Sequence, residues 1–299
     1  MKWFWIMIGV FMLFLIAFAV VFFEFYYRPF CNHKHLQSSS TLNLNKYATF
    51  NPSRYKTGYC ARTFKNNRSS LREEKRKPEL AVFDEKGEYV GAVPVGFENN
   101  TIEDIRVFMF NNVQYGVGAY NRHPYLIDFE QNPPKIRKIV GGKGKNWTPI
   151  IRDSDLYMYT DTTDDRLLVR KVDVATCIAS DPLEITGLAS SPKNHSKWRG
   201  STNWFPIDAN QYLGMLHSTH RTFISGRDYI NVFAILNWAN KTVKISKSVC
   251  FGKIMHPRIQ FPTDLEILND SVRIGYGVND TKAYFQMFPY ADVMRLFDA

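Results

Sequence analysis

An acidic pair followed by an arginine, Glu103-Asp104-Ile105-Arg106, is the segment of this sequence with the clearest capacity for chemistry. A carboxylate such as that of Asp104 can take a proton from a hydroxyl group or return one, which is general acid–base catalysis. An arginine two residues further along can orient that carboxylate through charge-assisted hydrogen bonds. The same two residues also fit a structural ion pair, and the residues alone leave both interpretations open.

Cationic residues in three further short motifs are candidates for binding an anion. They are Lys145 in Lys-Asn-Trp-Thr-Pro, Arg199 in Arg-Gly-Ser-Thr and His217 in Leu-His-Ser, with Arg166 as a weaker candidate. A bound phosphate requires fixed cations, and arginine offers it a bidentate pair of donors. His217 follows an apolar run, residues 212–216, so a hydrogen-bonded histidine of the core is the alternative.

Several acidic and cysteine–histidine clusters resemble metal sites but have simpler explanations. Asp153-Ser154-Asp155 has an Asp-x-Asp pattern, yet it falls where a hairpin turn is expected. Residues 161–165 are acidic but lack the regular spacing of a calcium loop. Cys31-x-His33-x-His35 has no evident fourth ligand. The sequence therefore predicts no metal and no cofactor.

A repeated pattern of strands is expected to position the candidate residues. Four segments share an apolar strand, a polar turn and a second apolar strand: residues 106–120, 148–162, 203–218 and 264–280. Each is followed by one more strand-like segment, at residues 125–129, 167–173, 229–236 and 283–288. A further β unit, residues 80–95, precedes them, so we predict an all-β, five-bladed propeller. A β-sandwich is the alternative, and residues 290–297 are expected to form a short terminal helix.

These motifs together resemble those of the β-mannoside phosphorylases, glycoside hydrolase family 130, and of related eukaryotic β-1,2-mannosyltransferases. Glu103-Asp104-Ile105-Arg106 is similar to the Glu-Asp-Pro-Arg motif of that family. The segment from Tyr276 to Thr281 matches its Tyr-Gly-x-x-Asp-Thr ending. The motifs of Lys145, Arg199 and His217 lie between these two in the expected order, so the resemblance covers about residues 95–290.

The resemblance implies a role for each candidate residue, with Asp104 as the single catalytic group. The residues implied to bind phosphate or a phosphorylated donor are Lys145, Arg199, His217 and Arg166. The residues implied to bind or orient the sugar are Glu103, Arg106, Tyr276 and Asp280, although Tyr276 and Asp280 also fit a turn that closes the last repeat. Two residues depart from the family pattern: Ile105 replaces a proline, and Lys145 stands where phosphorylases often have arginine. The second change leaves room for a different anion or donor.

The amino-terminal segment predicts a membrane anchor. Residues 3–23 are apolar almost without interruption, which is about the length that spans a bilayer as a helix. Tryptophans at one end and tyrosines at the other resemble interfacial aromatic belts. A cleaved signal peptide is the alternative. We therefore expect a signal-anchor helix over residues 1–27, a polar stem over residues 28–78 and a catalytic domain over residues 79–299.

Sequons, cysteines and charge indicate where the domain resides. There are seven Asn-x-Ser/Thr sequons, an excess that favours a lumenal chain: Asn67, Asn99, Asn146, Asn194, Asn240, Asn269 and Asn279. The four cysteines are even in number and fit an oxidising compartment, with three possible pairings. The net charge of +10 comes without a nucleic-acid motif, so no nucleic-acid partner is expected. We expect a single-pass type II membrane protein of the Golgi or endoplasmic reticulum.

Three functions remain open at this point. The first is a glycosyltransferase, a β-mannosyltransferase, that takes a sugar from a sugar nucleotide or sugar 1-phosphate and gives it to a glycan acceptor. The second is a phosphorylase or hydrolase of β-mannosides. The third is a glycan-binding propeller without catalysis. A hydrolase requires two carboxylates, one as acid and one to activate water. A phosphorylase or a transferase that inverts the anomeric carbon needs only one, and Asp104 can take that role.

Overall fold

The computed structural model describes residues 12, 41–44, 58–61, 79–83, 89–94, 96–97, 100–131, 133–163, 165–189, 196–222, 226–251, 260–278 and 282–298. The chain divides into two units, Met1–Lys34 and His35–Ala299. Within the described residues, no helix is both long and apolar enough to cross a membrane. The predicted anchor, residues 3–23, lies outside the described residues except for Met12.

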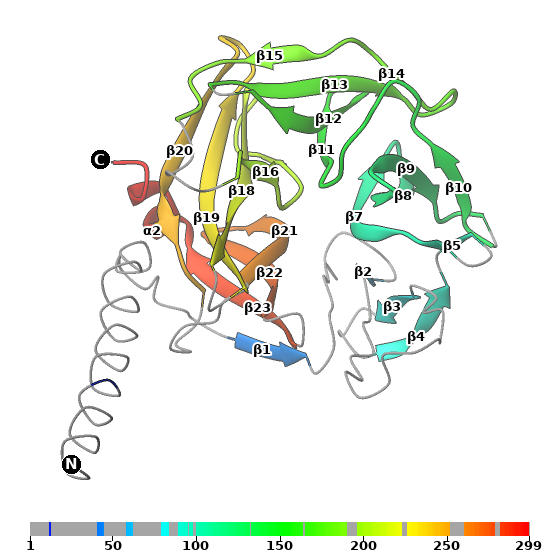
Figure 1. Cartoon of the computed structure of the whole chain (residues 1–299), viewed down its shortest axis with the longest axis horizontal. Coiled ribbons are helices and arrows are strands. Elements are labelled where there is room, and N and C mark those ends of the chain that lie inside the picture. The colour runs from blue at the N-terminus through cyan, green and yellow to red at the C-terminus, as the bar shows by residue number, and fades with distance from the viewer. Residues whose placement is uncertain are drawn as a thin grey trace, which may run out of the picture. The chain divides into compact units, whose positions relative to one another are not determined.

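Four antiparallel blades contain most of the described strands, and Figure 1 shows them arranged around a common centre. The β7 blade consists of β7 (Glu103–Phe110), β8 (Val113–Tyr120), β9 (His123–Asp128) and β10 (Lys135–Lys138). The β11 blade consists of β11 (Thr148–Arg152), β12 (Asp155–Thr162), β13 (Leu167–Asp173), β14 (Ile178–Ala179) and β15 (Leu183–Ile185). The β18 blade consists of β16 (Arg199–Gly200), β17 (Phe205–Pro206), β18 (Gln211–Thr222), β19 (Gly226–Asn237) and β20 (Thr242–Val249). The β21 blade consists of β21 (Gln260–Leu268), β22 (Ser271–Val278), β23 (Lys282–Pro289) and β1 (Thr41–Leu44).

The expected fifth blade does not form within the described residues. The described residues of its predicted segment, residues 80–95, lie in a three-stranded sheet of β2 (Gly58–Ala61), β3 (Glu79–Phe83) and β4 (Tyr89–Pro94). A two-stranded ribbon of β5 (Gly96–Phe97) and β6 (Asn100–Thr101) follows. The described chain is thus an all-β propeller with four blades, and the prediction of five blades is corrected to four.

The segment predicted to be a stem, residues 28–78, contributes strands to this fold. Thr41–Leu44 pairs with β23 as the edge strand of the β21 blade, and Gly58–Ala61 pairs with β3. Each strand has only four residues, which is too short for an apolar–polar alternation to stand out in a polar sequence. The predicted domain boundary at residue 79 therefore excludes two strands that belong to the sheets.

Short hairpin turns explain why the predicted repeats fold as they do. All four predicted pairs of strands form, as β7–β8, β11–β12, β17–β18 and β21–β22. In the first, Asn111 and Asn112 both have positive φ angles, 50° and 61°, as a tight two-residue hairpin requires. Asparagine tolerates this conformation better than most residues. The predicted terminal helix is present as α2 (Tyr290–Arg295).

The hydrophobic core lies between neighbouring blades. Phe108 of the β7 blade packs in one cluster with Leu156 and Met158 of the β11 blade. Similar clusters join the β11 blade to the β18 blade and the β18 blade to the β21 blade. Fully burying one such side chain stabilises the fold by roughly 1.5–3 kcal/mol. This packing fixes the first strands of the blades, since β7 contacts both β11 and β21.

The cysteines do not form the two disulfides that four cysteines allow. Cys177 is a free thiol, buried between the β7 and β11 blades, where burial raises its pKa. Cys250 is disulfide-bonded. Cys177 packs as a small apolar residue, so the expectation of complete pairing is corrected.

Candidate functional site

Asp104 lies in a backbone irregularity at the start of β7. The register between β7 and β8 shifts between Glu103 and Arg106, which is the mark of a β-bulge. Asp104 has a φ of 54°, in the left-handed region that aspartate tolerates better than most residues. Bulges re-aim side chains and often occur beside functional sites. The partly buried Asp104 is therefore set apart from the regular pleat of its strand.

Arg106 holds this bulge in place from within the protein. Its residue is only 1% exposed, and its Nη1 donates to the Asp104 carbonyl oxygen over 2.7 Å. Its Nε donates to the carbonyl oxygen of Ser201, in the β18 blade. The guanidinium also lies 5.1 Å from the centre of the Phe261 ring, in the β21 blade. One buried cation thus ties three blades together, and it supports Asp104 through the backbone.

His217 is buried beside this arginine. It is 2% exposed, and its Nδ1 lies 2.8 Å from the Ser201 hydroxyl oxygen, within hydrogen-bonding distance. Burial lowers the pKa of His217 well below its ordinary value of 6.5, and the charges of Arg199, Arg106 and Lys145 lower it further. The imidazole is therefore neutral at neutral pH, because burial and the three positive charges both disfavour its protonated form.

Lys145 and Arg199 reach the site from two different connections. Lys145 lies just before β11, and Arg199 on β16 pairs directly with His217 on β18. The two segments lie close because residue 200 is glycine. A Cβ atom there would come within 2.5 Å of the Asn146 carbonyl oxygen and 2.7 Å of a Thr148 side-chain carbon. The two backbone segments can lie this close only because residue 200 has no side chain. Gly200 therefore sets the distance between the segments that carry Lys145 and Arg199.

Two aromatic rings and a serine complete the site, and sequence reasoning did not single them out. Tyr229 stacks on His217 with ring centres 5.5 Å apart, and Phe261 meets the same imidazole edge-on at 4.9 Å. Ser201 links His217 to Arg106. Its hydroxyl lies within hydrogen-bonding distance of the His217 imidazole, and its carbonyl oxygen accepts from Arg106. Ser201 lies inside the Arg-Gly-Ser-Thr motif, so the motif was a usable signal for it. Phe261 comes close only through the packing of blades.

The remaining predicted residues do not join this cluster. Arg166 lies between β12 and β13, is partly exposed and forms ion pairs with Asp165 and with Glu184 on β15, so its assignment to the phosphate stays a prediction. Tyr276 is 3% exposed, packs on Phe251 with ring centres 4.7 Å apart and donates to Gln286. These contacts place it in the core of the β21 blade, and its assignment to the sugar stays a prediction.

Two further predicted residues receive no side-chain description. Glu103 is part of β7, and the description covers its backbone only. Asp280 lies outside the described residues. Both stay predictions.

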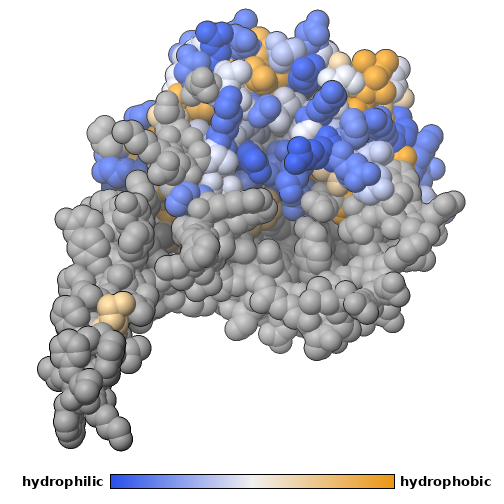
Figure 2. Space-filling view, in the orientation of Figure 1, coloured by the Kyte–Doolittle hydropathy of each residue, from blue (hydrophilic) through white to orange (hydrophobic). Residues whose placement is uncertain are grey.

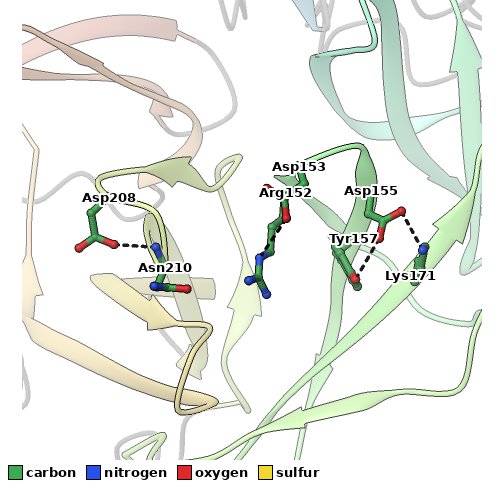
Figure 3. A network of polar contacts seen from close by, with 7 residues as sticks. All are labelled: Arg152, Asp153, Asp155, Tyr157, Lys171, Asp208 and Asn210. Atoms are coloured by element: carbon green, nitrogen blue, oxygen red, sulfur yellow. Dashed lines mark hydrogen bonds and ion pairs between the residues drawn. The ribbon is translucent and has the colours of Figure 1, made fainter.

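The acidic motif Asp153-Ser154-Asp155 serves the hairpin between β11 and β12, as expected. Figure 3 shows Asp155 between the Lys171 ammonium, at 2.7 Å, and the Tyr157 hydroxyl, which donates to it over 3.4 Å. Asp153 is exposed in the turn with a φ of 53°. Across the described part of the chain, no three His, Cys, Asp or Glu side chains gather in a way that could hold a metal.

Comparisons with known proteins agree with the architecture. No family model and no curated protein matches the sequence. A β-1,2-mannobiose phosphorylase from Listeria innocua, in complex with β-1,2-mannobiose, is similar in structure with a TM-score of 0.60 and 11% identity, over 89% of this chain and 95% of that chain. A mannose phosphorylase from Leishmania mexicana, in complex with a phosphate ion, has a TM-score of 0.52 and 14% identity, over 92% and 93%. A putative glycoside hydrolase from Parabacteroides distasonis has a TM-score of 0.57 and 10% identity, over 87% and 90%. This likeness shows that the chain has the propeller fold found in these structures.

Proposed function

We propose that this chain is a sugar-processing enzyme, namely an inverting glycosyltransferase that moves a β-mannosyl group from a phosphorylated donor to a glycan acceptor. The observation that carries the proposal is the buried network that joins the Asp104 bulge, through Arg106 and Ser201, to the neutral His217. The charges of Arg199, Arg106 and Lys145 act on that imidazole. Transfer from a phosphorylated sugar requires a carboxylate for the proton and cations for the charge of the leaving group, and this region of the chain supplies both kinds of residue.

The chemistry assigns one role to the carboxylate and another to the cations. Asp104 takes the proton from the acceptor hydroxyl, directly or through a sugar hydroxyl, while that oxygen forms a bond to the anomeric carbon. The bond from the anomeric carbon to the phosphate oxygen breaks, and the phosphate or nucleotide leaves with the electron pair. Lys145 and Arg199 stabilise the charge that develops on the leaving group. Tyr229 and Phe261 pack against His217 and hold the imidazole in place.

The similar solved structures support the substrate class. Two of them are named as phosphorylases of mannose-containing sugars, one bound to a mannobiose and one to phosphate. A phosphorylase of β-mannosides is accordingly the second candidate function, since it uses the same carboxylate as the acid in the reverse direction. Both reactions need one carboxylate and one anion site, and the proposal assigns these roles to Asp104 and to Lys145 with Arg199.

Activity measurements with matched variants test the proposal. The full-length protein is incubated with sugar nucleotides and sugar 1-phosphates in the presence of mannosides, and in a second series with phosphate and β-mannosides. Asp104→Asn should lower the rate of either reaction by roughly 100-fold or more, because general acid–base catalysis typically contributes that much. Asp153→Asn is the matched control, since Asp153 is also an aspartate with positive φ but lies in an exposed turn.

Each outcome of these assays has a distinct meaning. Transfer from a sugar nucleotide or sugar 1-phosphate that Asp104→Asn abolishes supports the transferase, and phosphate-dependent cleavage alone supports the phosphorylase. Glycan binding that Asp104→Asn leaves unchanged, with no turnover in any series, would mean a binding protein without catalysis and would refute the enzyme.

The proposal includes a location. We propose a type II anchor over residues 3–23 with the propeller in the lumen of the Golgi or endoplasmic reticulum, on the strength of the apolar run and the excess of sequons. Protease digestion of sealed membranes tests it, because a lumenal domain is protected until detergent is added. Digestion without detergent would place the domain on the cytosolic side.

A further inference from the structure

A cavity lies at the junction of the β7 and β11 blades, outside the site described above. Its volume is about 590 Å³, which falls within the range of pockets that hold small ligands. The residues that give it its chemistry are His123, Lys138, Lys143, Trp147, Asp161 and Arg170. Neither Asp104 nor His217 is among its lining residues. It is therefore a separate space, although Lys145 of the candidate site lies only two residues before Trp147.

Glycines and a parallel bridge hold one wall of this cavity in place. The wall is the connection from β10 to β11, where Val140 forms a bridge to Ile178 of the next blade. Gly141 has a φ of 86°, and a Cβ atom there would meet the Ala179 carbonyl oxygen at 2.9 Å. A Cβ atom on Gly142 would overlap the Trp147 indole. This connection is packed so closely that the cavity keeps its shape without a ligand.

The charge of the cavity lining is strongly positive. Lys138, Lys143 and Arg170 face one carboxylate, that of Asp161. The Asp161 carboxylate accepts from the Thr162 backbone N–H over 2.8 Å, which occupies part of its capacity. Within the described ranges, Lys138 and Lys143 form no ion pair with any residue. Two ammonium groups beside a cavity therefore have charge available for a ligand.

Arg170 is the third cation of the lining, and its position is fixed. It lies on β13 and donates through Nη1 to the Ser180 carbonyl oxygen over 2.6 Å. His123 also lines the cavity, but its Nδ1 is a buried atom without a hydrogen-bond partner among the described residues. The ammonium groups of Lys138 and Lys143 and the Arg170 guanidinium are therefore the groups that a ligand would meet.

We propose that this cavity binds the oxyanion group of a small acidic sugar, either a sugar phosphate or a hexuronate. Two lysines and a positioned arginine match the several acceptor oxygens of a phosphate or carboxylate. The oxyanion part of the proposal stands on the lining alone, whereas the sugar part rests on the proposed function. On the face seen in Figure 2, hydrophilic side chains cover most of the described surface, which suits polar ligands.

Calorimetric titration of the full-length protein tests the site. The probes are mannose 6-phosphate, glucuronate and, as the neutral control, mannose. The double variant Lys138→Gln/Lys143→Gln should weaken binding of the acidic probe roughly tenfold, since it removes two charge-assisted contacts. Lys135→Gln is the matched control, because Lys135 is exposed on the same strand, β10, but does not line the cavity. It should bind like the native protein.

A variant of the candidate site separates the two anion sites. Arg199→Gln should leave this binding unchanged, because Arg199 does not line the cavity. Binding that Arg199→Gln weakens and the double lysine variant does not would place the ligand in the candidate site and overturn the proposal. The absence of binding by any acidic probe, or binding of neutral mannose to the native protein as tight as that of the acidic probes, would overturn it too. Turnover is measured on the same samples, so that cavity binding without turnover would refute only the proposed function.

Discussion

The substitution Arg106→Met removes the cation that joins three blades and supports the Asp104 bulge. In the native protein its guanidinium donates to the carbonyl oxygens of Asp104 and Ser201 and lies over the Phe261 ring. Methionine has a similar length and fills most of the space, so that the change removes the polar contacts with little loss of volume.

The expected loss of stability follows from these contacts. Each buried carbonyl left without its donor costs about 1–3 kcal/mol, and the lost contact with the ring costs about 0.5–2 kcal/mol. Removing a buried charge recovers part of this, because burying the guanidinium also costs free energy. We therefore expect the free energy of unfolding to fall by about 3 kcal/mol, a large part of the 5–15 kcal/mol typical of a domain.

Urea denaturation followed by tryptophan fluorescence measures this loss, with Arg137→Met as the matched control. Arg137 donates to one carbonyl oxygen, that of Ala175, over 2.8 Å at an exposed position, so its loss should cost less than about 1 kcal/mol. Arg106→Lys keeps the charge but not the fork of donors, and should give an intermediate value. If Arg106→Met were no more destabilising than Arg137→Met, the buried network would not hold the bulge and the argument for the site would fail.

Three further predictions concern the same region. The free energy of unfolding should fall as the pH drops below 6.5, because His217 takes up a proton in the unfolded chain but not in the native one. In the native chain it is mainly burial that lowers the pKa of His217. Denaturation of His217→Gln at several pH values should lack this pH-dependent component. Gly200→Ala should lower the melting temperature and the rate together, since a Cβ atom would come within 2.5 Å of the Asn146 carbonyl oxygen; overpacking of this kind costs about 1–3 kcal/mol. If the protein enters the secretory pathway, peptide mass spectrometry should find glycans at the exposed Asn240 and Asn269 and none at Asn146, which is 5% exposed.

These predictions can each fail in a specific way. An unchanged pH dependence in His217→Gln would show that another group titrates. A Gly200→Ala protein as active and stable as the native one would show that β16 can move away. A glycan at Asn146 would mean that this segment is accessible during synthesis and would count against a site beside Lys145.

The sequence predicted the hairpins because their signals are local. Alternating apolar residues and turn residues such as Asn111-Asn112 lie within a dozen positions of one another, and all four predicted hairpins are present. The short helix after residue 289 was likewise readable. The number of blades could not be predicted from the sequence. The first β unit pairs with a strand at residues 58–61, which lies in a segment whose composition resembles a linker.

The candidate site was predictable in its charged residues and not in their surroundings. Asp104, Arg106, Lys145, Arg199 and His217 carry recognisable chemistry in short motifs, and the charges of Arg106, Lys145 and Arg199 all act on the His217 imidazole. Arg166 and Tyr276 show what the sequence does not reveal. A motif or a charge does not indicate whether a side chain faces the centre of the propeller or packs within a blade. Phe261 depends on the contact between two blades, which only the folded chain creates.

The pairing of Thr41–Leu44 with β23 has a consequence for how the chain folds during synthesis. β1 leaves the ribosome among the first elements and its partner among the last, so the β21 blade cannot be completed until nearly the whole chain has emerged. Contacts between such distant segments slow folding, because the intervening chain must be ordered first. A chain truncated before residue 45 would leave the outer edge of β23 open, and exposed sheet edges tend to pair with other molecules. We therefore expect β1 to join the sheet late in folding. Loss of β1 should appear as aggregation during expression before any loss of activity is seen.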